Sequence, residues 1–473
     1  MGRSFFRCIY HNVCYNGEQG GETMADRSLR QITDGVIWKQ LLSYFFPILL
    51  GTFFQQMYNT VDTIIVGRFV GTQALAAVGA TSPLISLVTG FFVGMSTGAT
   101  VLLSQFYGAG DRAGVSKALH SGIALALLMG ALITLLGFSC GKQLLLWMNT
   151  PESCMADSLL YARIYFVGAI ASTVYNMGAG VLRAMGDSKR PTVFLMITCA
   201  LNIVGDLLFV LVLRMGIAGV AVATVFSQTV SAVLVLLTLA KLPDGMHFGI
   251  RKLSLNGKLL GRILAVGIPA GLQMTMFDLA GVLIQSGVNS FGDVTVAAWT
   301  AYCKTDFLTW MISGAFGVSI TTFVGQNFGA GKLDRVKRSV WVCMGMSMAL
   351  VGLLSVAELI SRQYILGIYT TDAEVIRLGA YLMLFTVPFN FLFMPVEIFA
   401  GTMRGTGYSV APMVVMGVCV CLYRVVWVLT VVAKWHYIEL LAICYPISWG
   451  LASAVLYIIY LRGSWLRQPA IKE

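Results

Sequence analysis

The chain has 473 residues, of which 57% are hydrophobic and 11% are charged, whereas soluble domains carry roughly 25% charged residues. Its mean hydropathy of +0.80 excludes an ordinary soluble protein. The formal net charge of +11 raises the alternative of a nucleic-acid-binding protein, which the positions of the charges must decide.

Apolar windows of about 20 residues can cross a bilayer core that is about 30 Å thick. Windows of this length predict helices, since an isolated strand would leave its backbone groups unpaired in lipid. The chain contains twelve of them, at 37–66, 73–105, 118–146, 157–184, 192–213, 218–240, 260–289, 295–324, 338–361, 376–402, 411–433 and 438–461.

The Lys and Arg residues gather in every second loop between these windows. If the N-terminus is inside, the inner loops hold most of them, including Arg112, Lys189 and Arg338. Cytoplasmic loops of membrane proteins carry such an excess. We therefore interpret the basic charge as membrane topology, with both termini cytoplasmic, and expect no nucleic-acid partner.

The first residues lack the apolar core of a secretory signal, so 1–35 are expected to form a cytoplasmic tail that starts at Met1 or Met24. The ten cysteines include no C-x-x-C pair. Cys140 and Cys154 flank a predicted outer loop, but free thiols are the expected state, because unpaired Cys is commonly buried.

Two pairs of segments repeat at one offset. "SQFYGAGDRAGV" at 104–115 matches "GQNFGAGKLDRV" at 325–336 when shifted by 221 residues, and "GVLRAMGDSKRP" at 180–191 matches "GTMRGTGYSVAP" at 401–412 at the same shift. Six predicted helices lie in each half, and the matched motifs fall at equivalent helix ends. The halves are therefore predicted to be parallel repeats about an axis along the membrane normal.

The predicted fold class is an all-α polytopic membrane protein with twelve transmembrane helices in two parallel six-helix repeats. Two such lobes can rock about a central cavity that opens to alternate sides. Pro47 and Pro269 fall at similar repeat positions and fit helices that bend. The predicted division is an N-lobe at 36–240, a linker at 241–259, a C-lobe at 260–461 and a cytoplasmic C-terminal tail at 462–473.

Ionisable residues inside membrane helices are costly and are therefore candidates for function. At about 1.5 Å per residue, Asp62, Asp206 and Thr224 share one level in the outer half of the N-lobe. Asn202 lies one turn deeper on the face of Asp206, and Tyr161 falls at a similar level. No Lys or Arg of this lobe shares that depth. Their oxygen atoms suit a small hard cation, so these residues predict a proton or sodium site.

The C-lobe carries charges of both signs at one depth. Asp278, Lys304, Asp306 and Arg424 lie roughly 14–16 Å from the predicted outer surface. Because buried charges are normally paired, we predict a structural network in which Asp278 or Asp306 forms an ion pair with Lys304 or Arg424.

Three stretches together resemble the multidrug and toxic compound extrusion (MATE) family: "PILLGTFFQQMYNTVDTIIVGRFVGTQALAAVG" from Pro47, "GQNFGAGK" at 325–332 and "MRGTGYSVAPM" at 403–413. The family belongs to a larger flippase superfamily, and the resemblance covers about 36–461. It implies a V-shaped pair of six-helix lobes that export organic cations in exchange for H+ or Na+. It also implies a multi-pass protein of the bacterial inner membrane.

The resemblance also assigns residues. In one branch of the family, the coupling site lies in the first lobe, and its residues match Asp62, Asn202, Asp206 and Thr224, with Tyr161 and Asn176 as weaker matches. A second branch couples through acids on helices 7 and 10. Here Phe277 stands at the comparable helix-7 position, with Asp278 beside it and Glu397 on helix 10, so this mechanism is less favoured. Candidates for the substrate cavity are Gln55, Gln56, Gln273, Gln285, Asn176 and Trp310.

An enzyme is not expected, because the four histidines lie at predicted helix ends or in loops and offer no nucleophile or metal cluster. The chain has no phosphate-binding loop, so transport must run on an ion gradient without a cofactor. The alternative function is a flippase for a lipid-linked or amphipathic substrate, which needs basic groups in its cavity. The expected partners are small organic cations and the lipid bilayer, with the protein acting as a monomer.

Overall fold

The computed structural model describes residues 32–148, 150–243 and 245–467. The expected N-terminal tail, with Met1 and Met24, lies almost entirely outside these ranges, as does the C-terminal tail from residue 468. Eleven helices of the described chain are long and apolar enough to cross a membrane. The pair α6 (Glu152–Val167) and α7 (Ala169–Ala184), bent by 44°, makes a twelfth span. The predicted twelve-helix architecture is confirmed.

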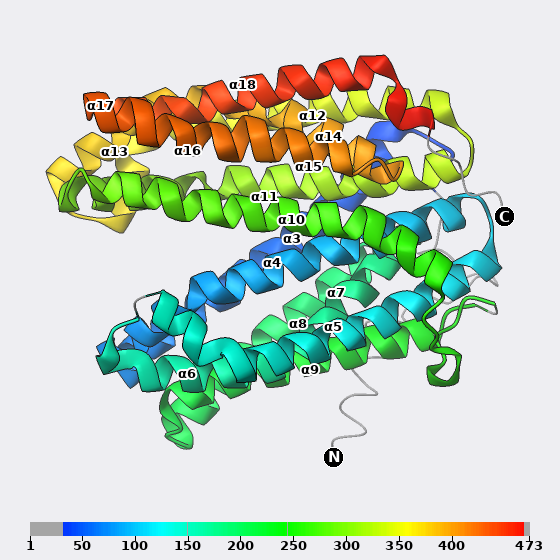
Figure 1. Cartoon of the computed structure of the whole chain (residues 1–473), viewed down its shortest axis with the longest axis horizontal. Helices are drawn as coiled ribbons and strands as arrows, with labels where there is room; N and C mark the ends of the chain where they lie inside the picture. The colour runs from blue at the N-terminus through cyan, green and yellow to red at the C-terminus, as the bar shows by residue number, and fades with distance from the viewer. Residues whose placement is uncertain (1–31, 149, 244, 468–473) are drawn as a thin grey trace.

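The two lobes form two layers that converge toward one end (Figure 1). The lower layer, here the N-lobe, also contains α3 (Ile37–Ile65), η1 (Val66–Val70), α4 (Thr72–Gly108), α5 (Arg112–Trp147), α8 (Lys189–Asp206), η2 (Leu207–Val212) and α9 (Gly216–Ala240). The short turn η3 (Ile250–Lys252) lies between the lobes in sequence.

The upper layer, here the C-lobe, contains four long helices and two spans that are broken into shorter segments. The long helices are α10 (Gly257–Asn289), α11 (Asp293–Gly329), α12 (Leu333–Tyr369) and α18 (Ile438–Arg462). The first broken span runs through α13 (Ala373–Thr386), η4 (Val387–Leu392) and α14 (Phe393–Gly405). The second runs through α15 (Val410–Val415), η5 (Met416–Leu422), α16 (Tyr423–Trp427), η6 (Val428–Val432) and α17 (Ala433–Trp435), and η7 (Ser464–Arg467) ends the described chain.

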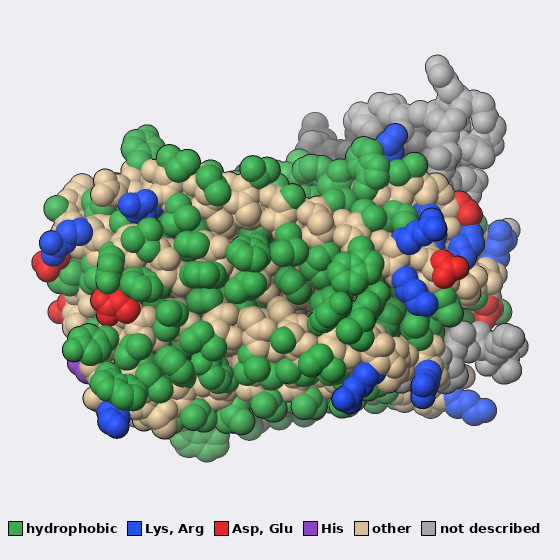
Figure 2. Space-filling view, turned by 90° about the horizontal axis from the view of Figure 1, so that it is seen from above, with side chains coloured by type: hydrophobic (Ala, Val, Ile, Leu, Met, Phe, Trp, Pro, Cys, Tyr) green, Lys and Arg blue, Asp and Glu red, His purple; other side chains and the backbone are tan. Residues whose placement is uncertain are grey.

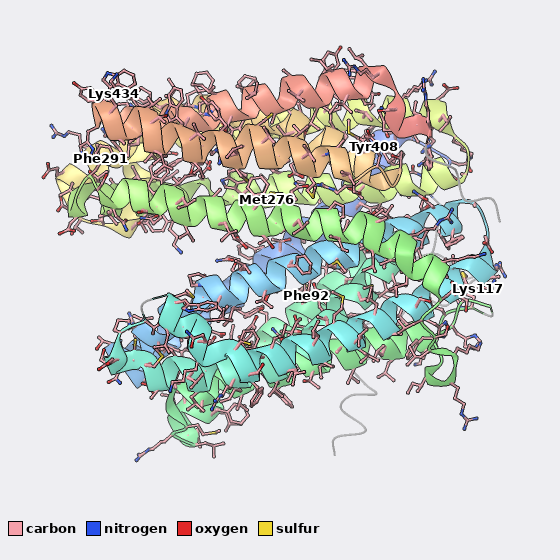
Figure 3. All side chains as sticks on the ribbon, viewed as in Figure 1. Phe92, Lys117, Met276, Phe291, Tyr408 and Lys434 are labelled. Atoms are coloured by element: carbon pink, nitrogen blue, oxygen red, sulfur yellow. The ribbon has the colours of Figure 1, made fainter. Side chains whose placement is uncertain are left out.

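Hydrophobic side chains cover the middle of the molecular surface, while Lys, Arg, Asp and Glu gather toward its two ends (Figure 2). Leu353 and Ile360 on α12, for example, are 71% and 81% exposed. Figure 3 marks the ends with Lys117 and Tyr408 on one side and Phe291 and Lys434 on the other. Apolar side chains gain nothing from exposure to water, so this belt faces lipid, and the chain is a multi-pass membrane protein.

Six glycines occupy equivalent helix ends in the two lobes. Each of three pairs, spaced by 221 residues, adopts a left-handed backbone that disfavours side chains with a Cβ. Gly71 and Gly292 (φ 125° and 89°) precede α4 and α11, and Gly110 and Gly331 (75° and 72°) follow the same two helices. Gly186 and Gly407 (103° and 92°) follow α7 and α14. The repeat in the sequence is thus a repeat of helix ends.

The lobes approach each other closely where α4 crosses α10. A Cβ atom on Gly94 would lie 2.5 Å from Gly271 Cα, and one on Gly98 would lie 2.1 Å from the carbonyl oxygen of Ile263. Only helices with small residues at the crossing can approach so closely.

A symmetric latch joins the lobes at the end where they converge, here called the closed end. Gln105 Nε2 donates to the carbonyl oxygen of Gly405 at 2.9 Å, and Gln326 Nε2 donates to that of Ala184 at 2.7 Å. The repeat offset relates both the two donors and the two acceptors. Between them, Gly108 and Gly329 leave no space, since their Cβ atoms would lie 1.9 Å and 2.0 Å from the backbone oxygens of Gln326 and Gln105.

Helix α3 belongs to both lobes. Near its start, Phe45 stacks on Phe316 of α11 with ring centroids 4.2 Å apart, whereas Ile65 at its end is buried in an N-lobe cluster. Pro47 cannot donate to the carbonyl of Ser43, and Ser188 donates to that oxygen instead at 3.4 Å. The proline is therefore accommodated by an outside donor.

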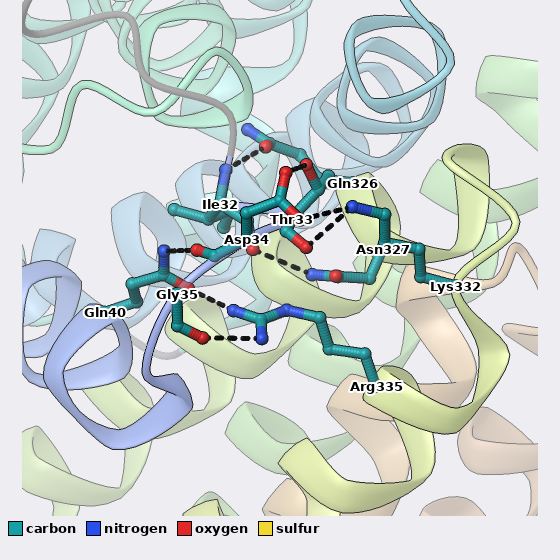
Figure 4. A network of polar contacts seen from close by, with 9 residues as sticks. All are labelled: Ile32, Thr33, Asp34, Gly35, Gln40, Gln326, Asn327, Lys332 and Arg335. Atoms are coloured by element: carbon teal, nitrogen blue, oxygen red, sulfur yellow. Dashed lines mark hydrogen bonds and ion pairs between the residues drawn. The ribbon is translucent and has the colours of Figure 1, made fainter.

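The segment before α3 is tied to the C-lobe beside the latch (Figure 4). Gln326 Oε1 accepts from the backbone N–H of Ile32 at 2.9 Å, and Lys332 Nζ lies 2.6 Å from Asp34 Oδ1. Arg335 donates to the carbonyl of Gly35 at 2.7 Å. The Lys332 ammonium lowers the pKa of Asp34. The exposed Asp34–Lys332 ion pair is therefore fully formed at a pH above the usual pKa of an Asp, and it is lost as the pH falls through the lowered pKa.

We predict that Gly98→Ala lowers the free energy of unfolding by about 1–3 kcal/mol, because the methyl group would force α4 away from α10. Thermal melting of the purified protein in detergent measures the effect. The matched control is Gly281→Ala on α10, where nothing lies within 4 Å of the added Cβ. Equal melting temperatures for the two variants would show that the crossing tolerates a larger residue.

Candidate functional site

The structure brings together Asp62 of α3, Asn202 and Asp206 of α8, and Thr224 of α9. Thr224 Oγ1 donates to Asp62 Oδ2 at 3.2 Å, and Asn202 and Asp206 lie within interaction range of the Asp62 carboxyl group. All four residues are buried; Asp62, the most exposed, retains 7% of its surface. This set is called the N-lobe cluster below.

The N-lobe cluster contains more polar atoms than its hydrogen bonds satisfy. One oxygen of Asp62, both oxygens of Asp206 and both side-chain polar atoms of Asn202 are buried without a hydrogen bond of good geometry. The described residues form three ion pairs, Asp187–Arg190, Asp34–Lys332 and Glu397–Arg404, and none involves the cluster. Buried carboxylates without a base must bind a cation or a proton, since isolated buried charge is costly.

Local helix geometry is irregular just beyond both acids. Helix α3 passes directly into the π-turn η1 after Ile65, and α8 passes into the π-turn η2 directly after Asp206. Such turns are rare within helices and are frequent at functional sites. Both acids therefore lie next to backbone that is not regular α-helix.

Tyr161 and Asn176 were weaker candidates for the same site. Tyr161 is buried and interacts electrostatically with both Asp62 and Asp206. Asn176 lies elsewhere: its Nδ2 donates to the carbonyl oxygen of Ser172 at 2.9 Å, and it lines a small separate pocket. The structure therefore places Tyr161, but not Asn176, beside the N-lobe cluster.

A cavity of about 780 Å³ lies between the lobes and reaches the N-lobe cluster through Asp62. Among the described residues, its walls carry three carboxylates, of Asp62, Asp278 and Glu397, and no Lys, Arg or His. Glu397 is paired with Arg404 at 3.4 Å, whereas Asp62 and Asp278 form no ion pair with any residue that the structure describes. Aromatic residues from both lobes line the same space: Tyr58, Tyr161, Tyr165, Phe277, Trp310 and Phe393.

The substrate-cavity candidates divide into two groups. Gln55, Gln273 and Trp310 line this cavity, but Gln56 and Gln285 do not. Gln285 donates to Asn289 Oδ1 at 2.9 Å near the end of α10. Sequence spacing identified polar residues on the correct helices but could not give their rotation about the helix axis.

The predicted ion-pair network in the C-lobe is wrong. Asp306 accepts from Trp310 Nε1 at 2.8 Å and from Asn390 Nδ2 at 2.7 Å, while Lys304 is exposed. Arg424 stacks on the Tyr445 ring, with Cζ 3.9 Å from its centroid, and donates to Ser448. The four charges share a depth but point to different neighbours, because depth does not fix direction around a helix.

Sequence reasoning missed Glu358, which is 4% exposed and has one oxygen without a hydrogen-bond partner. The predicted span ended at 361, which placed Glu358 at the membrane surface, but α12 continues to Tyr369. The reading of Cys140 and Cys154 as unpaired is confirmed, since both are free thiols.

Comparison with known proteins agrees with these features. The family model MatE matches residues 47–208 and again residues 269–429, so one model fits each lobe. The probable multidrug resistance proteins YpnP and YoeA of Bacillus subtilis are 30% and 28% identical to the chain. The alignments cover 73% and 80% of the chain and 78% and 83% of these relatives. A solved structure described as the outward-facing conformation of a multidrug resistance MATE family transporter of the MOP superfamily has a TM-score of 0.86 at 21% identity. That match covers 95% of this chain and all of that one and shows a common fold.

Two parallel six-helix lobes around a shared cavity define a membrane transporter rather than an enzyme. The two matches of the family model together cover most of the chain. The chain belongs to the MatE family, and transporters of this family need no cofactor.

Proposed function

We propose that this protein is a secondary active antiporter that exports organic cations in exchange for H+ or Na+, with the N-lobe cluster as its coupling site. The observation that carries the proposal is the pair of buried carboxylates, Asp62 and Asp206, with no basic partner. Both coupling ions fit this set of oxygens, since a proton or a small hard cation removes the same unfavourable charge.

The position of Asp62 supports direct coupling. Asp62 belongs to the N-lobe cluster and also lines the central cavity, so the coupling ion and a cationic substrate meet at one residue. Binding of the ion neutralises the carboxylate and weakens its attraction for the substrate. Transport requires that the ion bind the two conformations of the protein with different affinities.

Helix α3 connects the proposed ion site to both lobes, so ion binding at Asp62 can change how the lobes pack. Its end carries Asp62 in the N-lobe, while its start packs against the C-lobe at Phe316. A change in charge at Asp62 alters the balance of contacts along this helix, and bending near Pro47 relieves it. Prolines are the usual sites at which helices bend.

The walls of the cavity support organic cations as substrates. Unpaired carboxylates of Asp62 and Asp278 attract positive charge, and the aromatic rings offer faces on which cations bind favourably. The multidrug resistance relatives agree with a broad substrate range. The flippase alternative needs basic groups for phosphate, whereas the nearby Arg404 is already paired with Glu397.

We further propose that the protein acts as a monomer in the bacterial inner membrane, with the closed end in the cytoplasm. Lys117 lies at that end, as do Lys332 and Arg335, which bind the segment before α3. This agrees with the excess of basic residues on the inner side of membrane proteins. In this orientation, the structure is closed toward the cytoplasm.

We expect Asp62→Asn and Asp206→Asn each to abolish gradient-driven efflux while leaving a folded protein, because the amide can neither release a proton nor hold a cation by charge. Asn202→Ala and Thr224→Ala should weaken efflux without abolishing it. Efflux of a fluorescent cation from proteoliposomes, under separate H+ and Na+ gradients, measures the effect and identifies the ion. Asp293→Asn, at an exposed acid in the first turn of α11, is the matched control. Full efflux by both Asp62 and Asp206 variants would overturn the coupling role.

We expect Asp278→Asn to raise KM for a cationic drug about tenfold, with much less effect on an uncharged one, since tenfold corresponds to about 1.4 kcal/mol. The reason is the loss of an unpaired carboxylate from the cavity wall. Initial efflux rates at varied drug concentration measure KM, with Lys304→Gln as a control that changes an exposed charge outside the cavity. An equal change for charged and uncharged drugs would exclude a charge-specific role for Asp278.

A further inference from the structure

The C-lobe holds a buried carboxylate that has no base and is bound by two N–H donors. Asp306 of α11 is 3% exposed. Its Oδ1 accepts from Asn390 at 2.7 Å, and its Oδ2 accepts from Trp310, one helical turn away, at 2.8 Å. Asn390 lies in the 3₁₀ segment η4, which begins at Val387 and contains Pro388. The break in this span is thus the place where an amide is presented to the acid.

A second buried acid lies near the first. Glu358 of α12 is 4% exposed, and its Oε2 has no hydrogen-bond partner. It interacts electrostatically with Asp306, so the two carboxylates repel each other when both are ionised. Two buried acids without a base cannot both ionise at low cost, and one of them retains a proton.

The other charged and titratable groups around Asp306 do not compensate it. On α11 itself, Tyr302 and Cys303 interact with Asp306, and Lys304 is exposed. Across the lobe, Tyr445 of α18 interacts electrostatically with both Asp306 and Arg424, and Arg424 is held by the Tyr445 ring and by Ser448. The negative charge of Glu358 therefore repels that of Asp306, and no positive group described beside Asp306 offsets this repulsion.

We propose that Asp306 and Glu358 form a second proton-binding site, buried in the C-lobe, and that Trp310 transmits its charge state to the wall of the central cavity. The ligand is a proton rather than a metal ion. Both Asp306 oxygens already accept from N–H groups, and such donors face the carboxylate where a metal ion would need oxygen ligands. The N-lobe cluster differs, because there one oxygen of Asp62 and both oxygens of Asp206 are without hydrogen-bond partners.

Trp310 is positioned to report on this site. Its indole N–H bonds to Asp306, while its ring lines the cavity and packs edge-on against Phe393 at 4.8 Å between centroids. When one proton is bound, Asp306 is anionic and holds both donors by charge-assisted hydrogen bonds. Uptake of the second proton from water neutralises Asp306, weakens both bonds and frees the Trp310 ring to reorient. Trp310 then changes the shape of the aromatic wall that meets the substrate, a consequence that rests on the proposed function.

The test is the emission of Trp310 as a function of pH, in the full-length protein in lipid nanodiscs and without any drug. The chain has nine tryptophans, so the difference between the unaltered protein and Trp310→Phe isolates the signal. We expect a titration of this difference signal in the unaltered protein. The first proton neutralises Glu358 and the second neutralises Asp306, so the signal should titrate in two steps. Glu358→Gln should remove the step at higher pH, since the amide carries no charge to lose. Asp306→Asn should abolish the step at lower pH, in which the hydrogen bond of Trp310 changes.

Two matched controls separate this proposal from others. Asp293→Asn on the same helix should leave the titration unchanged, because that acid is exposed. Asp62→Asn should also leave it unchanged, although the same variant abolishes efflux under the proposed function. A signal that does not change with pH, or that titrates identically in the Asp306 and Glu358 variants and the unaltered protein, overturns the second site. If Asp306→Asn does not fold, the loss of the step at higher pH in Glu358→Gln decides the outcome alone. A titration that moves with Asp62→Asn instead assigns the proton to the N-lobe cluster.

Discussion

The close approach of two backbones at the closed end determines how the rest of the molecule is arranged. The ends of α4 and α11 contact each other at Gly108 and Gly329, where no side chain fits, and the two latch glutamines satisfy carbonyls of the opposite lobe. Unpaired backbone groups are costly in a membrane, so these bonds hold the lobes together. Because the lobes are joined at this end, the central cavity lies between them beyond the joined region. The same residues must separate in any state that opens toward the other side.

Helix α3 connects this latch to the N-lobe cluster. The segment from Ile32 to Gly35, just before α3, binds the C-lobe beside Gln326. The helix then leaves the C-lobe core and enters the N-lobe near Asp62. A single helix therefore contacts the closed end at its start and the proposed ion site near its end. Through α3, a change of charge at Asp62 can alter how the two lobes pack, without a long chain of side-chain contacts.

The two lobes share a backbone plan but place their acids differently. In the N-lobe, Asp62 and Asp206 leave oxygens unsatisfied, whereas in the C-lobe the amide of Asn390 and the indole of Trp310 occupy both oxygens of Asp306. The first arrangement suits an ion that exchanges, and the second suits a charge that positions a side chain. The repeat constrains helix ends through its glycines, but it does not constrain the polar residues within the spans.

The sequence by itself determined the membrane class, the twelve spans, the parallel repeat and the acids of the N-lobe cluster. These features depend on hydropathy, helix length and an offset of 221 residues, all of which are linear properties of the chain. Only the tertiary structure decided which polar residues meet. It removed the expected ion pairs of Asp278, Lys304, Asp306 and Arg424, excluded Asn176, Gln56 and Gln285 from the sites proposed for them, and revealed Glu358. The physical reason is that depth along a helix follows from counting residues, whereas direction around it depends on packing, on breaks such as Pro388 and on where the helix ends.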